Sequence, residues 1–357
     1  MLQNEYKVIG VMSGTSLDGI DLATLHFSIS ENHTWKFQII NSETISYSSA
    51  WVQKLKEGIS YSEENLKILN KEYTVYLAEV INQFINKHKL KNLDAVCSHG
   101  HTILHQPDKG ITLQIGNLPE LATLIQQNVV CDFRVQDVNL GGQGAPLVPI
   151  GDELLFSEYD YCLNLGGFAN VSLERDGERI AYDICAVNVV LNKYANELGF
   201  DYDDKGQLAQ GGTFSMSVSG LLETVPFYKV LPPKSLGMEW VDQEIFPILD
   251  AQNIDPKKKL RTYTDHIARQ IARQFHKDSK VLVSGGGAYN EYLLQKIKYY
   301  KKVDLILPSK ELIEFKEALI FGLLGVLKLR NEVNCLSSVT GALIDHSSGK
   351  IFRIKSV

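Results

Sequence analysis

The hydrophobic positions of this chain follow two periods, one typical of strands and one typical of helices. Short apolar runs at residues 8–12 and 20–24, followed by a third run at 34–47, predict three strands near the N-terminus. Apolar residues then recur every three or four positions over residues 62–88. That spacing predicts one long amphipathic helix, which begins after an N-cap serine, Ser62.

The same order of elements, three strands followed by helices that alternate with strands, occurs twice along the chain. After the long helix we expect strands at 93–97, 112–115 and 129–133, with a helix that Asn117 caps. A second set of three strands then begins at residue 159. The later elements that we expect are strands at 159–165, 169–174, 179–184, 281–283 and 303–307, helices at 188–198, 236–250, 256–276, 290–297 and 315–329, loops at 205–212 and 230–235, and a strand or hairpin at 339–354.

This repetition predicts an α/β protein built as two similar halves with a cleft between them. The segment 139–151 is rich in Gly and Pro and has no hydrophobic period, so we expect it to cross from one half to the other. The predicted N-terminal lobe is residues 1–135, completed by residues 335–357, and the predicted C-terminal lobe is residues 136–334.

Length and composition agree with a two-domain globular protein. The chain has 357 residues, of which 44% are hydrophobic and 22% charged, and its formal net charge is −6. This balance gives no basic surface for nucleic acid or an anionic membrane. No apolar run reaches the roughly 18 residues of a membrane span, and no signal peptide is recognisable, so we expect a cytoplasmic protein. The five cysteines are widely spaced without a CxxC pair, so neither a disulfide framework nor a cysteine zinc site is expected.

The segment between the first two predicted strands, residues 13–19, consists almost entirely of Gly, Ser, Thr and Asp. A hairpin tip of this kind lets the backbone approach a ligand closely, and its N–H and hydroxyl groups can hold phosphate oxygens. It is not a Walker loop, because the motif is absent and a strand follows the tip. Asp18 and Asp21 would suit magnesium beside a phosphate. The alternative is an ordinary hairpin with a flexible turn.

The string MSGTSLDGIDLA closely resembles the N-terminal signature of the anhydro-N-acetylmuramic acid kinases. Four further motifs of that family, GGQGAPLVP, NLGGFANVS, SGGGAYN and VTGA, follow in order, so the resemblance runs from Val8 to about Ala342. It implies a two-lobed, actin/hexokinase-like (ribonuclease H-like, duplicated) fold with a central cleft. It also implies ATP and Mg²⁺ as cofactors and a homodimer.

In that superfamily the two lobes grip the nucleotide through glycine turns. The resemblance therefore implies nucleotide contacts from the first hairpin, from the turn at 166–167 and from the strand-to-helix turn at 285–287, where glycines at a helix start also offer N–H donors. For each turn alone, a plain structural turn is the alternative. The implied nucleotide-binding residues are Gly14, Thr15, Ser16, Leu17, Asp18, Gly19, Gly166, Gly167, Gly285, Gly286 and Gly287, with Asp18 also the implied metal ligand.

The segment HGHTILH contains three histidines, His99, His101 and His105, close enough in sequence to suggest a metal site. Hydrogen-bonding groups on a loop after a strand are the alternative. In the resembling family the corresponding segment, there typically HGQT, lies at the substrate cleft. This implies that His99 and Thr102 contact the substrate, while His101 departs from the family pattern.

Asp132 and Arg134 close the strand predicted at 129–133. A guanidinium pairs bidentately with a carboxylate, so Arg134 would clamp an anionic substrate group such as the lactyl carboxylate of muramic acid, with Asp132 orienting either the arginine or the sugar. A surface ion pair is the alternative. The resemblance places a glutamate corresponding to Glu317 against the sugar, whereas a solvated helix residue is the alternative.

Asp183 is the candidate general base, because a carboxylate at the end of the third strand of the second set would point toward the cleft. The alternative is an aspartate that caps the next helix. The family motif DTGPGN reads here DICAVN, so Asp183 and Asn188 match while the residues between them differ. The segment KSLGME at 234–239 resembles a family KSTGRE segment, with Leu236 and Met238 departing from it.

The implied reaction is the ATP-dependent opening of 1,6-anhydro-N-acetylmuramic acid to N-acetylmuramic acid 6-phosphate in cell-wall recycling. Two other classes stay open from the sequence. One is a kinase-like sugar-binding protein without turnover, suggested by the altered DICAVN loop. The other is an actin-like ATPase that acts on protein partners.

Overall fold

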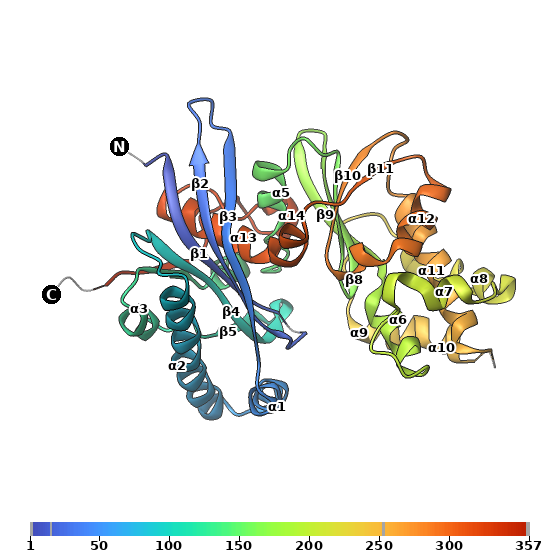
Figure 1. The fold of residues 1–357 in the computed structure, drawn as a ribbon, viewed down its shortest axis with the longest axis horizontal. Helices are drawn as coiled ribbons and strands as arrows, with labels where there is room; N and C mark the ends of the chain where they lie inside the picture. The colour runs from blue at the N-terminus through green and yellow to red at the C-terminus, as the bar shows by residue number, and fades with distance from the viewer. Residues whose placement is uncertain (1–2, 15, 252–253, 355–357) are drawn as a thin grey trace. The chain divides into compact units, whose positions relative to one another are not determined.

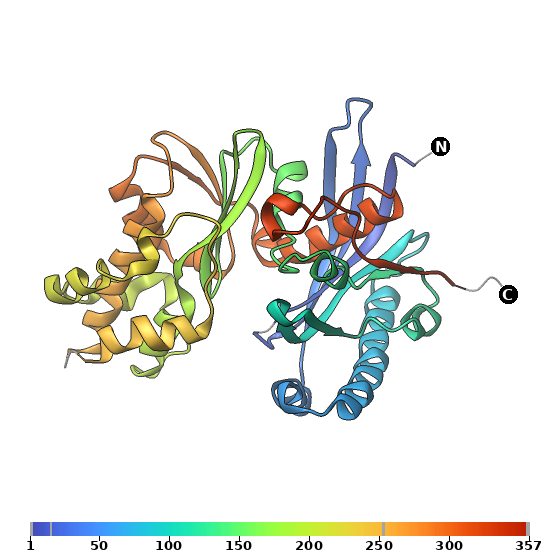
Figure 2. The same ribbon diagram turned by 180° about the vertical axis from the view of Figure 1, so that it is seen from behind.

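The computed structural model describes residues 3–14, 16–251 and 254–354, and Thr15, a predicted nucleotide contact, lies outside the described residues. The chain forms two compact units, residues 1–155 with 315–357 (unit 1) and residues 156–314 (unit 2). Figures 1 and 2 show both units from opposite sides. The boundaries between the predicted lobes lie at residues 135 and 335, whereas the boundaries between the compact units lie at residues 155 and 315. The lobes themselves stay a prediction.

Unit 1 is built on a sheet that begins with an antiparallel meander. β1 (Glu5–Ser13), β2 (Gly19–Ile29) and β3 (Trp35–Ser46) pair in sequence order. β4 (Ala95–Gln106) then lies parallel to β1, and β6 (Val129–Cys131) lies parallel to β4. Two short strands finish the sheet: β5 (Ile111–Ile115) pairs with β4, and β12 (Lys350–Phe352) pairs antiparallel with β6.

Helices cover both faces of this sheet, because alternate residues of the strands are buried on opposite sides. Ile9 and Val11 of β1 share a hydrophobic core with α2 (Glu63–Lys87), whose apolar stripe and Ser62 cap confirm the predicted long helix. Gly10, between them, faces the other side and lies against the backbone of Ala318 in α13 (Lys310–Leu329). Without a Cβ at Gly10, this apolar helix approaches the sheet closely.

Unit 2 repeats the strand order of unit 1. β7 (Tyr161–Leu165), β8 (Phe168–Arg175) and β9 (Glu178–Ala186) form an antiparallel meander, and β10 (Lys280–Ser284) and β11 (Asp304–Ile306) extend it in parallel from β7. The order β9-β8-β7-β10-β11 corresponds to β3-β2-β1-β4-β6 of unit 1. The predicted duplicated, actin/hexokinase-like α/β fold is therefore confirmed, while its central cleft stays a prediction.

The remaining helices pack around these two sheets, and the principal one of unit 2 is α11 (Pro256–Ala272), which packs on the core that β7, β8 and β9 form. The others are α1 (Ser49–Glu57), α3 (Glu120–Ile125), α4 (Val135–Asn139), α5 (Pro149–Leu155), α6 (Asn188–Asn196), α7 (Gln207–Gly211), α8 (Met216–Leu222), α9 (Met238–Trp240), α10 (Phe246–Asp250), α12 (Glu291–Tyr300) and α14 (Ser337–Thr340), with 3₁₀ turns at Gly58–Ser60, Pro107–Lys109, Asp204–Gly206, Pro226–Lys229 and Gly286–Tyr289 and a π-helical turn at Val241–Ile245.

Several predicted elements were wrong in detail. Residues 205–212, expected as a loop, contain α7. The strand expected within 339–354 is confirmed as β12, but it is short, and the segment begins with the end of α14. Asn117 does not cap α3; its side-chain amide donates to the carbonyl of His99 over 3.1 Å. All five cysteines are free and buried. Within the described parts of the chain, every helix is too short or too polar to cross a bilayer.

Candidate active site

The hairpin between β1 and β2 ends in an exposed tip. Pairing stops at Met12 and Asp21, and the tip then turns with Leu17 in the left-handed region at a φ of 63°. Gly19 has a packing role, because a Cβ there would lie 2.5 Å from the carbonyl oxygen of Ile45 in β3. Gly14 meets only Ser16 of its own tip, and Ser16 and Asp18 are exposed. Gly14, Ser16 and Asp18 are thus free to meet a ligand, whereas Gly19 is explained without one.

Arg134 is held in a defined position in unit 1. Its Nε donates to Nε2 of His99 over 2.8 Å, and Nη1 donates to the carbonyl oxygen of Gly144. The other ring nitrogen of His99, Nδ1, lies 2.9 Å from the carbonyl oxygen of Gly100 and must carry the proton, since a carbonyl only accepts. Burial lowers the pKa of His99, with the charge of Arg134 acting in the same direction. His99 is therefore neutral and orients Arg134.

Glu317 completes a charged group around Arg134. Burial lowers the pKa of Arg134 to about 10, and the negative charge of Glu317 opposes this, so the guanidinium is cationic at neutral pH. The Glu317 side chain is exposed by surface area, yet the surrounding protein reduces its hydration, and this desolvation raises its pKa. The charge of Arg134 opposes the rise, and the charge of Asp21 adds to it. The guanidinium is not the surface ion pair of the alternative interpretation, because it is half-buried and bonded to His99 and Gly144.

Asp132 and Thr102, the other predicted substrate residues, have partners within unit 1. Asp132 follows β6 in the left-handed region, at a φ of 61°, and its carboxylate lies 2.7 Å from Nζ of Lys350 in β12. The hydroxyl of Thr102 accepts from the side-chain amide of Gln114 over 3.3 Å. Asp132 thus holds β12 through Lys350 next to the segment that carries Arg134. This ion pair could not be predicted from the sequence position of Asp132.

The three histidines of HGHTILH have separate partners and form no metal cluster among the described residues. His105 contacts the Thr112 hydroxyl over 3.1 Å. His101 begins a buried chain of polar contacts, from its Nδ1 to the Ser13 hydroxyl over 2.8 Å, from Ser13 to Tyr47 over 2.6 Å and from Tyr47 to Tyr73 over 2.6 Å. Burial lowers the pKa of His101 to about 4. His101 therefore anchors the residue from which the hairpin tip departs.

In unit 2 the two predicted glycine turns lie together, because β7 and β10 are neighbours and Ser284 pairs with Asn164. Gly285 has a φ of 80° and passes so near β7 that a Cβ would meet Asn164 at 2.6 Å. Gly286 is exposed, with nothing nearer to its Cβ position than the Asn188 amide at 4.0 Å. Gly166 is less open, since the side-chain amide of Asn164 lies 3.4 Å from its Cβ position. The two turns and Asn188 thus expose backbone where a phosphate or a nucleoside could approach.

Asp183 lies within β9, three residues before its end, and not at the end of a strand as predicted. The register shifts there, with Asn170 opposite Asp183 and Ala169 opposite Cys185, which is a β-bulge of the kind that re-aims side chains at active sites. Burial raises the pKa of Asp183 to about 6. Its carboxylate does not cap α6, whose N-cap residue Val187 makes no side-chain bond.

The segment at 234–239 is the partner of Asp183. The backbone N–H of Leu236 donates to Oδ2 of Asp183 over 2.8 Å, and the N–H of Asp183 donates to the carbonyl oxygen of Lys234 over 3.0 Å. Because both contacts use the backbone, the side-chain departures at Leu236 and Met238 do not affect them. From the sequence, the changed side chains at Leu236 and Met238 weaken the likeness of this segment to the family. The contact with Asp183 is made by the main chain, which a comparison of side chains does not detect.

Comparison with known proteins places the chain in a family. The family model described as "Anhydro-N-acetylmuramic acid kinase" matches residues 6–354. Anhydro-N-acetylmuramic acid kinases from Mannheimia succiniciproducens and Francisella tularensis subsp. novicida are each 32% identical, covering 96% and 95% of this chain and 98% and 97% of their own lengths. The Bacillus cereus relative of the same name is 29% identical over 94% of this chain.

Solved structures also align over most of the chain, at low identity. Component A of the (R)-2-hydroxyglutaryl-CoA dehydratase from Acidaminococcus fermentans is 13% identical, with a TM-score of 0.47, and covers 91% of this chain and 99% of its own. A ligand-bound xylulose kinase from Lactobacillus acidophilus is 11% identical, with a TM-score of 0.45, and covers 91% and 90%. The assignment rests on the sequence matches, which run almost from end to end: the chain belongs to the anhydro-N-acetylmuramic acid kinase family.

Proposed function

We propose that this protein uses ATP and water to convert 1,6-anhydro-N-acetylmuramic acid into N-acetylmuramic acid 6-phosphate, in the cytoplasm, as a step of peptidoglycan recycling. The observation that carries the proposal is the family match over residues 6–354, and Asp183 is the proposed general base. A general base works best with a pKa near the operating pH, and burial brings the pKa of this carboxylate to about 6.

In the proposed reaction Asp183 takes a proton from water, whose oxygen forms a bond to the anomeric carbon of the sugar. The bond from that carbon to O6 breaks, and O6 attacks the γ-phosphorus of ATP as the bond to the ADP oxygen breaks. The Leu236 N–H, which donates to one carboxylate oxygen over 2.8 Å, leaves the other oxygen for the water. The proton held by Asp183 then passes to solvent.

Arg134 is the proposed binding group for the lactyl carboxylate of the sugar. Arginine has more N–H donors than its contacts with His99 and Gly144 use, so donors remain for a carboxylate. Glu317, beside Arg134, would accept from a sugar hydroxyl. His99 and Asn117 act indirectly, since they fix the position of the guanidinium and of the segment that carries His99.

The nucleotide would contact the open backbone at Gly286 and the partly exposed turn at Gly166 in unit 2, and the backbone at Gly14 in unit 1. Asp18 fits the magnesium that accompanies ATP, because it is an exposed carboxylate, and Mg²⁺ is usually held by one or two carboxylates together with substrate phosphates. The ion would neutralise charge that develops on the transferred phosphoryl group. Phosphoryl transfer needs little more from the protein than this positioning and charge stabilisation.

The proposal is tested with purified protein, ATP, Mg²⁺ and the anhydro-sugar, by coupled ADP release and mass spectrometry of the product. Incorporation of oxygen from ¹⁸O-water at the anomeric carbon checks the hydrolytic step. Asp183→Asn should reduce turnover by roughly 10²–10⁴-fold while ATP binding is kept. The matched control is Asp201→Asn, which alters an exposed aspartate of the same unit and should leave turnover unchanged.

Three results would contradict the proposal. Near-normal turnover in Asp183→Asn with intact nucleotide binding would remove Asp183 as the base. ATP hydrolysis that ignores the sugar and responds to a protein partner would favour an actin-like ATPase, and sugar binding without ADP release would favour a sensor. A homodimer is part of the proposal, and sedimentation equilibrium measures it directly.

A further inference from the structure

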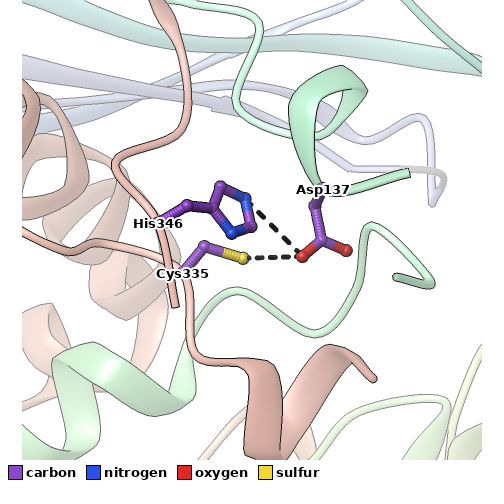
Figure 3. Close-up of side chains that lie close together, drawn as sticks. All are labelled: Asp137, Cys335 and His346. Carbon is purple, nitrogen blue, oxygen red and sulfur yellow. Dashed lines mark hydrogen bonds and ion pairs between the residues drawn. The ribbon is translucent and has the colours of Figure 1, made fainter. Parts of the chain in front are cut away.

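Three side chains from distant parts of the sequence meet in the interior of unit 1, apart from the residues assigned to substrate and nucleotide. They are Asp137 in α4, Cys335 and His346, and all three are buried (Figure 3). One ligand-type atom from each lies within 4.8 Å of the other two. Cys335 and His346 face each other across an isolated antiparallel bridge, so the backbone fixes their spacing.

Asp137 already accepts several hydrogen bonds in this cluster. Its Oδ2 accepts from the N–H of Gly144 over 2.6 Å, while Oδ1 accepts from the Thr340 hydroxyl over 2.7 Å and from the Cys335 thiol over 3.1 Å. These hydrogen bonds explain why a carboxylate can be buried here. They do not explain why a buried nitrogen of His346 faces the same carboxylate.

His346 turns an unpaired nitrogen toward this carboxylate. Its Nδ1 lies 3.0 Å from the carbonyl oxygen of Ile344 and therefore carries a proton. Nε2 is buried, has no hydrogen-bond partner in the described part of the chain, and lies 3.7 Å from Oδ1 of Asp137 (Figure 3). A nitrogen lone pair that faces a carboxylate oxygen is unfavourable unless a cation lies between them. That cation is either a proton on Nε2 or a metal ion.

The separations match those of ligands around one tetrahedral zinc ion. Bonds of about 2.0–2.3 Å to N, O and S place the ligand atoms of a tetrahedral site about 3.3–3.5 Å from one another. The observed distances from Asp137 Oδ1 are 3.1 Å to the sulfur of Cys335 and 3.7 Å to Nε2 of His346. Movements of a few tenths of an ångström would bring these two distances to the tetrahedral values, and a fourth ligand such as water would complete the coordination.

We propose that Asp137, Cys335 and His346 form a binding site for a divalent transition-metal ion of the zinc type. Thiolate and imidazole ligands select such ions over Mg²⁺, which prefers oxygen, so this site is distinct from the one that serves ATP. On binding, the Cys335 thiol releases its proton to solvent as the metal–sulfur bond forms. The thiolate and the carboxylate then balance the two charges of the ion.

The ion would also join elements that are far apart in sequence. Asp137 is bonded to Gly144, whose carbonyl accepts from Arg134, while Cys335 and His346 precede the strand β12. The site would therefore stabilise the C-terminal part of unit 1 against the segment that positions Arg134. Binding of the metal ion would therefore raise the free energy of unfolding, and this can be measured independently of kinase activity.

The test uses the full-length protein, stripped of metal with a chelator and titrated with Zn²⁺ against a chromophoric competitor. We expect one Zn²⁺ per chain, a higher melting temperature, and a sulfur-to-metal charge-transfer band when Co²⁺ replaces Zn²⁺. Cys335→Ala should abolish the band and weaken binding by more than the roughly 10–100-fold that loss of an outer-shell partner costs. The matched control is Cys97→Ala, which removes another buried free thiol of unit 1 and should leave both unchanged.

His346→Gln should likewise weaken Zn²⁺ binding, whereas His33→Gln, at an exposed histidine, should not. Absence of stoichiometric Zn²⁺ in the wild-type protein, or an unchanged Co²⁺ spectrum in Cys335→Ala, would overturn the proposal. So would nitrogen NMR showing that both His346 ring nitrogens stay protonated at saturating Zn²⁺. Stoichiometry and the Co²⁺ spectrum of the wild type decide the matter even where a variant fails to fold.

Discussion

Replacing the proposed base should change the stability of the protein by an amount that depends on pH. Burial raises the pKa of Asp183 from 3.8 to about 6, so the folded state binds this proton more tightly than the unfolded state does. The stabilisation from the bound proton is present below pH 4 and is lost as pH rises to about 6. A difference of about two pH units corresponds to about 3 kcal/mol, an upper value because Asp183 is half-buried.

The amide of Asp183→Asn cannot ionise, so the stability of this variant does not fall with rising pH for this reason. The difference in unfolding free energy, variant minus wild type, should therefore increase by up to about 3 kcal/mol between pH 4 and pH 8. Any constant cost of the amide, for example from its bond to the Leu236 N–H, cancels in this comparison. The same pKa predicts that kcat/KM of the wild type falls on the acid side with a midpoint near pH 6.

Guanidinium unfolding at five pH values measures the effect. Trp240 is the only tryptophan of residues 156–314, so its fluorescence reports on unit 2 when Trp35 and Trp51 are replaced by phenylalanine in every protein compared. Asp201→Asn is the control for loss of an exposed carboxylate in the same unit. A stability difference that stays constant from pH 4 to pH 8 would refute the reasoning, because it would mean that folding leaves the pKa of Asp183 unchanged.

Three other predictions concern binding and packing. Arg134→Lys should lower kcat/KM for the carboxylate-bearing sugar by roughly 10–100-fold, the cost of a charge-assisted hydrogen bond, and an analogue without the lactyl carboxylate should show no such loss. Gly286→Ala should raise the KM for ATP without lowering the melting temperature, since space for a Cβ is open there, whereas Gly220→Ala, at an equally open position in α8, should leave the KM for ATP unchanged. Gly325→Ala should destabilise unit 1 by about 1–3 kcal/mol, because the new Cβ meets the sulfur of Cys97, and adding Cys97→Ala should recover part of the loss in a thermal unfolding assay.

Periodicity was sufficient to predict the framework of both units. The α2 helix shows a 3.6-residue apolar stripe and a serine cap, and the two three-stranded meanders show short apolar runs between glycine-rich turns. Such local signals determine element type directly. The α7 helix at Gln207–Gly211 was missed because it has only one or two turns, and Ala209 is its one buried residue, so no apolar period marks it in the sequence.

The candidate site was predictable only as single positions. Arg134 and Asp183 were chosen as candidates from residue type and motif, their roles stay predictions, and burial shifts the pKa of both as described above. Their supports were not predictable, because they lie far away in the sequence: the Leu236 N–H acts through the backbone, and Lys350 joins Asp132 across the edge of the sheet. The cluster at Asp137 has no spacing signature at all, since its other members are about two hundred residues away.

The sheet of unit 1 has consequences for how the chain is made. Its last strand, β12, and the helix segment after Phe315 that packs on β1 are synthesised after the whole of unit 2. On the ribosome, residues 156–314 can therefore fold as one continuous segment. The N-terminal sheet is synthesised earlier, but its face around Gly10 stays exposed until α13 has been made. A fragment that ends at residue 314 should accordingly have a protease-resistant unit 2 and protease-sensitive N-terminal strands.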